Sequence, residues 1–274
     1  MKQLPPSIID FHVHLFPDKL FDAIWQHFRE LYDWQVLHPL YSRDCIAYLR
    51  KQGVCTIVYS NYAHKKGIAD GLNHWNLKII EEFDDIFCFA AYHPDDDHAL
   101  EKAERFLNHP KVLGFKLQFL VQTFFPHDSR LFPLYEMIIE KNKRLLFHVG
   151  TGPTQSPFVG VQHFREVLER YPQLPVNVAH MGGFEYKAFF DLLDAHPNLY
   201  FDTAFSFLPK TDLMFSLGRD CLERWKDRIL YGSDFPNLIY PRCEEIDCLL
   251  DLNLSDEFYQ KVFFDNAAAL IQSD

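Results

Sequence analysis

The chain alternates short apolar segments with stretches in which apolar residues recur at helical spacing. Each apolar segment is rich in β-branched or aromatic residues at consecutive positions, which is typical of a strand buried on both faces. Repeated strand–helix alternation predicts a parallel sheet with right-handed crossovers. Eight such units in 274 residues fit the α/β class and a single closed (β/α)8 TIM barrel. The predicted strands lie at 7–11, 55–60, 86–92, 112–117, 144–149, 175–180, 198–203 and 228–234.

An open, doubly wound sheet is the alternative architecture. Such sheets usually carry a glycine-rich phosphate loop, and neither GxGxxG nor GxxxxGK followed by Ser or Thr occurs in this sequence. The expected second helix begins at Ser42, a candidate N-cap, and stops at Gly53, a candidate C′ residue. No linker, charge block or low-complexity segment divides the chain, so we expect residues 1–274 to form one domain.

Composition limits the partners of this domain. Hydrophobic residues make up 48% of the chain and charged residues 24%, as in an ordinary globular protein. Acidic residues outnumber basic ones by 38 to 27, and the net charge of −11 argues against a nucleic acid or an anionic membrane as partner. The chain has no run of 18 apolar residues, no secretory signal and no CxxC pair. We therefore expect a cytoplasmic protein with reduced thiols that binds a small-molecule substrate, and a homodimer is the assembly we consider.

Polar residues with metal-binding or acid–base chemistry stand at the ends of the predicted strands. In (β/α)8 barrels, catalytic groups gather at the carboxyl ends of the strands. His12 and His14 project to the same side of an extended segment, so both imidazoles can reach one ion. Imidazoles with one carboxylate suit Zn²⁺ best, with Mn²⁺ or Fe²⁺ as alternatives. The other strand ends carry Lys116, His148, His180 and Asp234.

The order of these residues resembles the motifs of the amidohydrolase superfamily. The similar segments are IIDFHVHLFPD, GFKLQ, LLFHVG, VNVAHMGG and YGSDFP, and the tail LNLSDEFYQKVFFDNAAAL resembles the family's closing helix. The resemblance covers about residues 7 to 271 and is strongest to the amidohydrolase-2 branch, which includes aminocarboxymuconate-semialdehyde decarboxylase. One departure is Gln118, where relatives often carry a histidine.

The resemblance implies roles for the strand-end residues. His12, His14, His148 and Asp234 match the ligands of a single catalytic metal ion, and His180 matches a residue that contacts the metal-bound water or the substrate. In other branches the strand-4 lysine is carboxylated and bridges two ions. In that case Lys116 and His180 become ligands of a second metal ion. We favour one metal ion, with Lys116 as a cation that binds a substrate anion.

The expected chemistry follows from the metal ion. A bound Zn²⁺ lowers the pKa of water to about 7. Asp234 would accept the water's proton and deliver it to the leaving group, while His180 would stabilise the developing oxyanion. Asp10 is a candidate for fixing an imidazole tautomer, and Arg242 is the candidate that clamps a substrate carboxylate. Tyr59, Tyr62, Phe125 and Phe158 are candidates for an aromatic wall.

Two reactions fit such a site. The first expectation is hydrolysis of a small carboxylated amide, ester or lactone by a metal-activated water. The alternative is non-oxidative decarboxylation, or hydration, of an unsaturated or aromatic carboxylic acid. A non-catalytic binding barrel is disfavoured because every expected ligand is present. TatD-type nucleases carry a glutamate where this chain has Lys116, and histidinol-phosphatase-type enzymes end in Asp-x-His, whereas this chain has Asp234-Phe235-Pro236.

Overall fold

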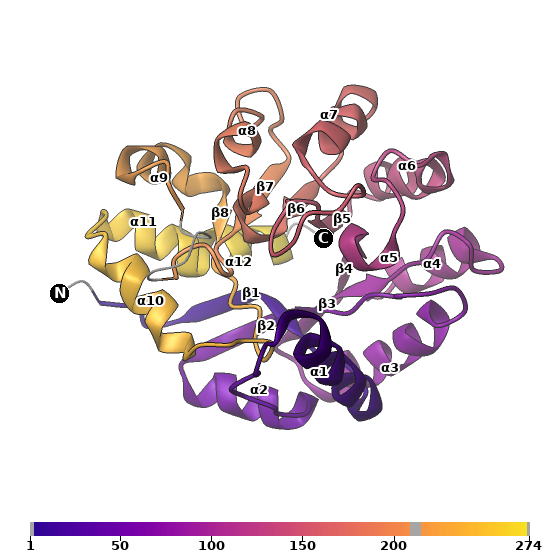
Figure 1. Cartoon of the computed structure of the whole chain (residues 1–274), viewed down its shortest axis with the longest axis horizontal. Coiled ribbons are helices and arrows are strands. Elements are labelled where there is room, and N and C mark those ends of the chain that lie inside the picture. Colours follow the sequence, from indigo (N-terminus) through magenta and orange to yellow (C-terminus); the bar gives the residue numbers. More distant parts are fainter. Residues whose placement is uncertain (1–2, 209–214, 273–274) are drawn as a thin grey trace.

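Eight parallel strands alternate with helices and form a nearly closed (β/α)8 barrel (Figure 1). The computed structural model describes residues 3–208 and 215–272. Each strand pairs with the next one in the chain, and the backbone of Phe11 donates to the carbonyl of Tyr231 (2.8 Å) where the first and last strands meet. The TIM barrel expected from the sequence is therefore confirmed. The strands are β1 (Ile8–His14), β2 (Val54–Ser60), β3 (Ile86–Ala91), β4 (Val112–Gln118), β5 (Arg144–His148), β6 (Val176–Val178), β7 (Leu199–Asp202) and β8 (Ile229–Leu230).

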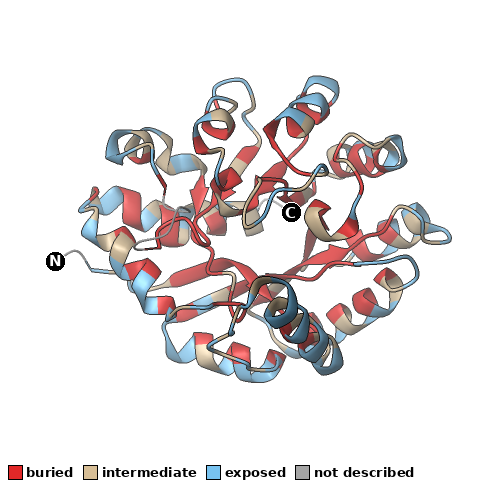
Figure 2. Cartoon of the chain, viewed as in Figure 1, coloured by how far each residue is buried: buried red, intermediate tan, exposed pale blue. Residues whose placement is uncertain are grey.

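Helices surround the strands in a ring, and their outward faces are exposed (Figure 2). Most of them return the chain from the end of one strand to the start of the next. The helix α1 differs, because it lies in front of the ring and its last residues line the same cavity as the strand ends (Figure 1). The helices are α1 (Asp18–Tyr32), α2 (Ser42–Lys51), α3 (Ala69–Glu82), α4 (Ala99–Leu107), α5 (Phe119–Gln122), α6 (Phe132–Glu140), α7 (Val161–Arg170), α8 (Tyr186–Phe190), α9 (Arg219–Trp225), α10 (Arg242–Asp251), α11 (Asp256–Gln260) and α12 (Asn266–Gln272), with the short helical turns η1 (Ser129–Leu131), η2 (Ala179–Gly182), η3 (Lys226–Arg228) and η4 (Lys261–Asp265).

The boundaries of α2 differ slightly from the sequence expectation. The helix begins at Ser42 as expected, but Tyr41 occupies the N-cap position and makes no capping side-chain bond. The Ser42 hydroxyl donates instead to the carbonyl of Phe16 (2.8 Å), so it ties α2 to the segment after β1. Among the residues that the structure describes, no helix combines the length and apolar character needed to cross a membrane.

An irregularity in β1 controls which side chains face the barrel interior. The pairing of β1 with β2 shifts register between Asp10 and Val13. Ile9 and Phe11 pack in the cluster that fills the barrel, whereas Val13 packs in the larger cluster that includes the helices. A register shift of this kind changes the phase of the side-chain alternation. It explains how one strand carries Asp10 away from the site and His12 into it.

Candidate metal centre

The carboxyl ends of β1 and β8 bring three ligand-type side chains together. His14 is the last residue of β1, and its backbone donates to the carbonyl of Phe235 (2.8 Å). The backbone of Asp234 donates to the carbonyl of His12 (2.7 Å), so Asp234 is held directly beside the two histidines. Gly232 permits this approach, because a Cβ there would lie 2.6 Å from the Cβ of His12.

The tautomers of the two histidines are fixed by their hydrogen bonds. The Nδ1 atom of His12 lies 2.9 Å from a carboxylate oxygen of Asp202, and Nδ1 of His14 lies 3.2 Å from the carbonyl of Ser60. Since these oxygens only accept, each Nδ1 carries the proton and each Nε2 keeps its lone pair. Burial, followed by the charge of Lys116, holds the pKa of His12 well below its usual range, so this imidazole stays neutral.

The Nε2 atoms of His12 and His14 and the Oδ1 atom of Asp234 therefore face one another with no proton between them. Oδ1 of Asp234 lies 2.8 Å from Nε2 of His14 and 3.4 Å from Nε2 of His12. This buried oxygen has no hydrogen-bond donor among the described residues. Two imidazole nitrogens and one carboxylate oxygen are a donor set that binds a divalent transition-metal ion, so these residues fit the expected metal.

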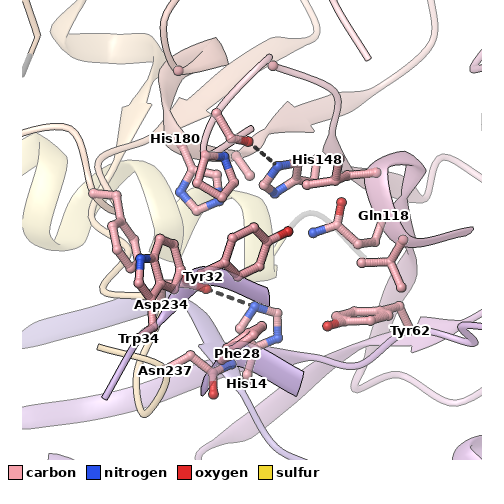
Figure 3. Close-up of a pocket in the computed structure, with 18 of the residues that line it drawn as sticks. His14, Phe28, Tyr32, Trp34, Tyr62, Gln118, His148, His180, Asp234 and Asn237 are labelled. Carbon is pink, nitrogen blue, oxygen red and sulfur yellow. Dashed lines mark hydrogen bonds and ion pairs between the residues drawn. The ribbon is translucent and has the colours of Figure 1, made fainter. Parts of the chain in front are cut away.

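His180 lies beside both His12 and His148. Its ring centre is 5.2 Å from that of His12 and 4.9 Å from that of His148, and Figure 3 shows the rings of His180 and His148 next to each other. Nδ1 of His180 lies 3.0 Å from the carbonyl of Ala204, so its Nε2 also keeps a lone pair. The residue has a left-handed backbone conformation (φ 57°), a strained geometry that often marks functional sites.

Asp202, the last residue of β7, was not among the residues singled out from the sequence. One oxygen of its carboxylate accepts from Nδ1 of His12, and the other accepts from the backbone of His180 (3.0 Å). Asp202 therefore orients two neighbouring imidazoles at once, which is the usual role of a carboxylate behind a metal ligand. Burial raises its pKa to about 6. The signal available in the sequence was its position near the carboxyl end of the predicted strand 198–203.

His148 is brought to the site, but not into the group of three. Its Nε2 lies 2.8 Å from the carbonyl of Gly152 and donates to it, so Nδ1 holds the lone pair. Ligand atoms of His12, His14 and Asp234 all lie within 4.8 Å of one another, and a second such group comprises His12, His180 and Asp202. His148 borders His180 instead. Its role as a metal ligand stays a prediction.

Lys116 lies at the base of the same centre. Its side chain is 1% exposed, and Nζ is 3.5 Å from Nε2 of His12. Burial lowers the pKa of the amine to about 8, although the charges of Asp202 and Asp234 oppose this shift. The contact supports a position beside the metal centre, and substrate binding by Lys116 stays a prediction.

Arg242 and Asp10 lie outside the cavity. The guanidinium of Arg242 is buried 3.7 Å from Oδ2 of Asp10 and lies 5.3 Å from the ring centre of Tyr231. Asp10 accepts from the hydroxyl (2.6 Å) and the backbone (3.0 Å) of Ser233 and contacts no imidazole ring. The register shift in β1 turns Asp10 away from His12, so Asp202 provides the contact that was expected of Asp10. Arg242 is the first residue of α10, packs against the barrel wall and does not line the cavity.

An aromatic cavity opens above the metal centre (Figure 3). Of the four aromatic residues expected to form its wall, only Tyr62 lines it. Most of the other rings come from α1 and the residues after it, which the sequence did not single out. No lysine or arginine is among the described residues that line the cavity. Its aromatic residues are Phe28, Tyr32, Trp34, Tyr62, Tyr186 and Phe205, and its polar side chains include His14, Gln118, His148, His180, Asp234 and Asn237.

A (β/α)8 barrel with clustered imidazoles and a carboxylate at the carboxyl ends of its strands defines the class of metal-dependent barrel enzymes. The profile of the amidohydrolase family matches residues 9–272, and the chain belongs to this family. The resemblance found in the sequence motifs is therefore confirmed. A comparison with curated proteins gave no match.

Solved structures of this fold include two decarboxylases. A 5-carboxyvanillate decarboxylase from Novosphingobium aromaticivorans, complexed with manganese and 4-hydroxy-3-methoxy-5-nitrobenzoic acid, is 14% identical, with a TM-score of 0.70 over 97% of this chain and 96% of that one. A 2,6-dihydroxybenzoate decarboxylase from Rhizobium is 18% identical, with a TM-score of 0.69 over 98% and 99%. A probable 2-pyrone-4,6-dicarboxylic acid hydrolase from Acinetobacter baumannii is 13% identical, with a TM-score of 0.66 over 97% and 99%. At these identities, the likeness concerns the fold.

Proposed function

We propose that this protein is a metal-dependent, non-oxidative decarboxylase of an aromatic monocarboxylic acid. The observation that carries the proposal is the cavity, whose lining joins aromatic rings to His14 and Asp234, two members of the group that includes His12. Aromatic side chains bind a planar ring in stacked or edge-to-face geometry. Two decarboxylases with the same fold are named for aromatic acids, which agrees with an aromatic substrate, and one of these acids, 2,6-dihydroxybenzoate, carries a single carboxylate.

The charge of the cavity favours a substrate with one carboxylate. No cationic side chain is found in the part of the cavity lining that the structure describes. A second carboxylate would therefore lose its hydration without gaining a cationic partner. One carboxylate at the metal centre, in contrast, would be neutralised there. The lack of a cationic partner for a second carboxylate disfavours a dicarboxylate of the kind named for the structurally similar hydrolase.

The metal ion would be held by His12, His14 and Asp234, with His148 and His180 beside it. When bound, it would supply positive charge that attracts and polarises the substrate carboxylate. The donor set favours Zn²⁺, and manganese in a structurally similar decarboxylase makes Mn²⁺ the second ion to test. The identity of the ion is part of the proposal.

Decarboxylation requires a proton at the carbon atom that loses carbon dioxide. The bond from the ring to the carboxylate breaks, carbon dioxide leaves, and the electron pair forms a C–H bond with the proton. Asp234 would hold the metal ion as a carboxylate, and we propose that it takes up a proton from solvent or substrate and delivers it to this carbon atom.

Hydrolysis of a small carboxylated amide, ester or lactone is the second candidate. It is favoured by the same cluster of imidazoles and carboxylate, which is suited to activating a water molecule, and by the similarity to the probable hydrolase. In this reaction Asp234 accepts the proton of the water instead of protonating carbon.

The experiment that separates the two reactions uses protein reconstituted with Zn²⁺ or Mn²⁺. 2,6-Dihydroxybenzoate labelled with ¹³C at the carboxyl carbon is offered beside two dicarboxylates, 5-carboxyvanillate and 2-pyrone-4,6-dicarboxylate, and beside simple lactones. We expect labelled carbon dioxide and the decarboxylated arene, both absent after treatment with a chelator. Turnover of the lactones alone, with ¹⁸O from water in the product, would establish the hydrolase instead.

A further inference from the structure

A second group of metal-ligand side chains lies away from the central cavity. His127 lies in the segment between α5 and η1, while His163 and Glu166 belong to α7. One ligand atom from each of these residues lies within 4.8 Å of the other two. His163 and Glu166 are three positions apart on one helix, a spacing that places them on the same face. Two separate elements therefore present three ligands to one point.

One ring nitrogen of each histidine in this group has no hydrogen-bond partner among the described residues. Nδ1 of His127 and Nδ1 of His163 are both buried, and neither has a hydrogen-bond partner among the described residues. Nδ1 of His127 lies 3.6 Å from a carboxylate oxygen of Glu166, which is beyond hydrogen-bond distance.

The surrounding side chains hold the two imidazoles in place. The ring of Phe125 stacks on His127 with centres 5.2 Å apart and contacts His163 at 4.9 Å. His127 is 31% exposed and Glu166 is 57% exposed, so one side of the group remains open to solvent. Water can therefore complete the coordination of an ion at this point.

We propose that His127, His163 and Glu166 bind a divalent transition-metal ion of the Zn²⁺ type. Two imidazole nitrogens and one carboxylate oxygen form a common protein ligand set for zinc, with water in the fourth position. The ion would fasten the segment after α5 to α7. Phe125 of that segment also packs on Phe158 (5.1 Å), which lies in the connection from β5 to α7 that lines the cavity at Gly150 and Gly152. This peripheral site would therefore brace one wall of the cavity.

Titration of the metal-free, full-length protein with Co²⁺ tests the proposal, because Co²⁺ bound to nitrogen and oxygen ligands absorbs visible light. We expect His163→Gln to bind one Co²⁺ per chain fewer than the wild type, and Glu166→Gln to weaken that equivalent at least about tenfold. Glu169→Gln removes the same charge from an exposed position of α7 and is the matched control, with binding like the wild type. His14→Ala is expected to retain the peripheral equivalent.

Equal stoichiometry and equal affinity in the wild type, His163→Gln and Glu166→Gln would overturn the proposal. Circular dichroism checks that each variant is folded. If His163→Gln does not fold, Glu166→Gln decides alone, because the Glu166 side chain is 57% exposed. The central site and its reaction do not enter this comparison, so failure of the proposed decarboxylation leaves the test intact.

Discussion

Asp202 contacts both His12 and His180 and so orients two imidazoles of the metal centre. Its carboxylate fixes the proton of His12 on Nδ1 and holds the backbone of His180, so its removal frees both imidazoles to turn. We expect Asp202→Ala to weaken metal binding by about 10- to 100-fold. Competition with a chelator of known affinity measures the change, and Asp194→Ala, an exposed carboxylate, is the control. Affinity equal to the wild type would show that Asp202 does not orient His12.

Asp234 combines two roles, and one substitution separates them. In Asp234→Asn, the Nε2 atoms of His12 and His14 still converge, so we expect metal binding to weaken only in part. The proton carrier is lost, and turnover should fall by at least about 10² to 10⁴-fold. Steady-state kinetics at saturating metal ion measure the second effect. A rate within a few-fold of the wild type would remove Asp234 from the reaction.

Lys116 distinguishes a centre with one ion from a centre with two. If the amine stays uncarboxylated, its charge beside the metal centre helps to attract the substrate carboxylate, so Lys116→Met raises KM and leaves the metal content unchanged. The protein equilibrated with ¹³C-bicarbonate then shows no carbamate carbon by NMR. A carbamate signal, together with the loss of one ion in the variant, would contradict the single-ion account and make Lys116 and His180 ligands of a second ion.

At the scale of elements, Arg242 joins the start of α10 to the barrel wall. Its guanidinium is the charge that faces the buried Asp10, so Arg242→Ala leaves a buried carboxylate without that partner. We expect a loss of about 3 kcal/mol in the free energy of unfolding. The KM should stay unchanged, because Arg242 does not line the cavity. Urea denaturation measures the first quantity. Unchanged stability with a raised KM would restore the carboxylate clamp expected from the sequence.

The strands themselves were predictable, and the reason is visible in their burial. Because β1 and β4 are covered on both faces, they appear in the sequence as continuous apolar runs. The register shift in β1 was not predictable, since it leaves no mark in the apolar pattern. Asp10 was assigned to an imidazole because it precedes the two histidines in the sequence, but its carboxylate bonds to Ser233 while Asp202 contacts the ring of His12.

At the scale of the whole molecule, parallel strands bring their carboxyl ends to one edge, which is why residues from positions 12 to 234 could be grouped from the sequence. The cavity could not be derived in this way. Half of the aromatic residues in its wall, Phe28, Tyr32 and Trp34, come from α1 and the residues after it, and the position of this helix in front of the ring depends on tertiary packing. Tyr59, for example, follows the strand pattern like Tyr62, but its hydroxyl bonds to Asn76 (3.0 Å) within the helical layer.

The central claim is that the lone pairs of His12, His14 and Asp234 converge because they bind a divalent metal ion. Anomalous diffraction from crystals grown with Mn²⁺ tests this claim most directly. The account predicts a manganese peak in bonding contact with Nε2 of His12, Nε2 of His14 and Oδ1 of Asp234. The absence of a peak between these atoms in crystals saturated with Mn²⁺, with His14 paired directly to Asp234, would contradict it.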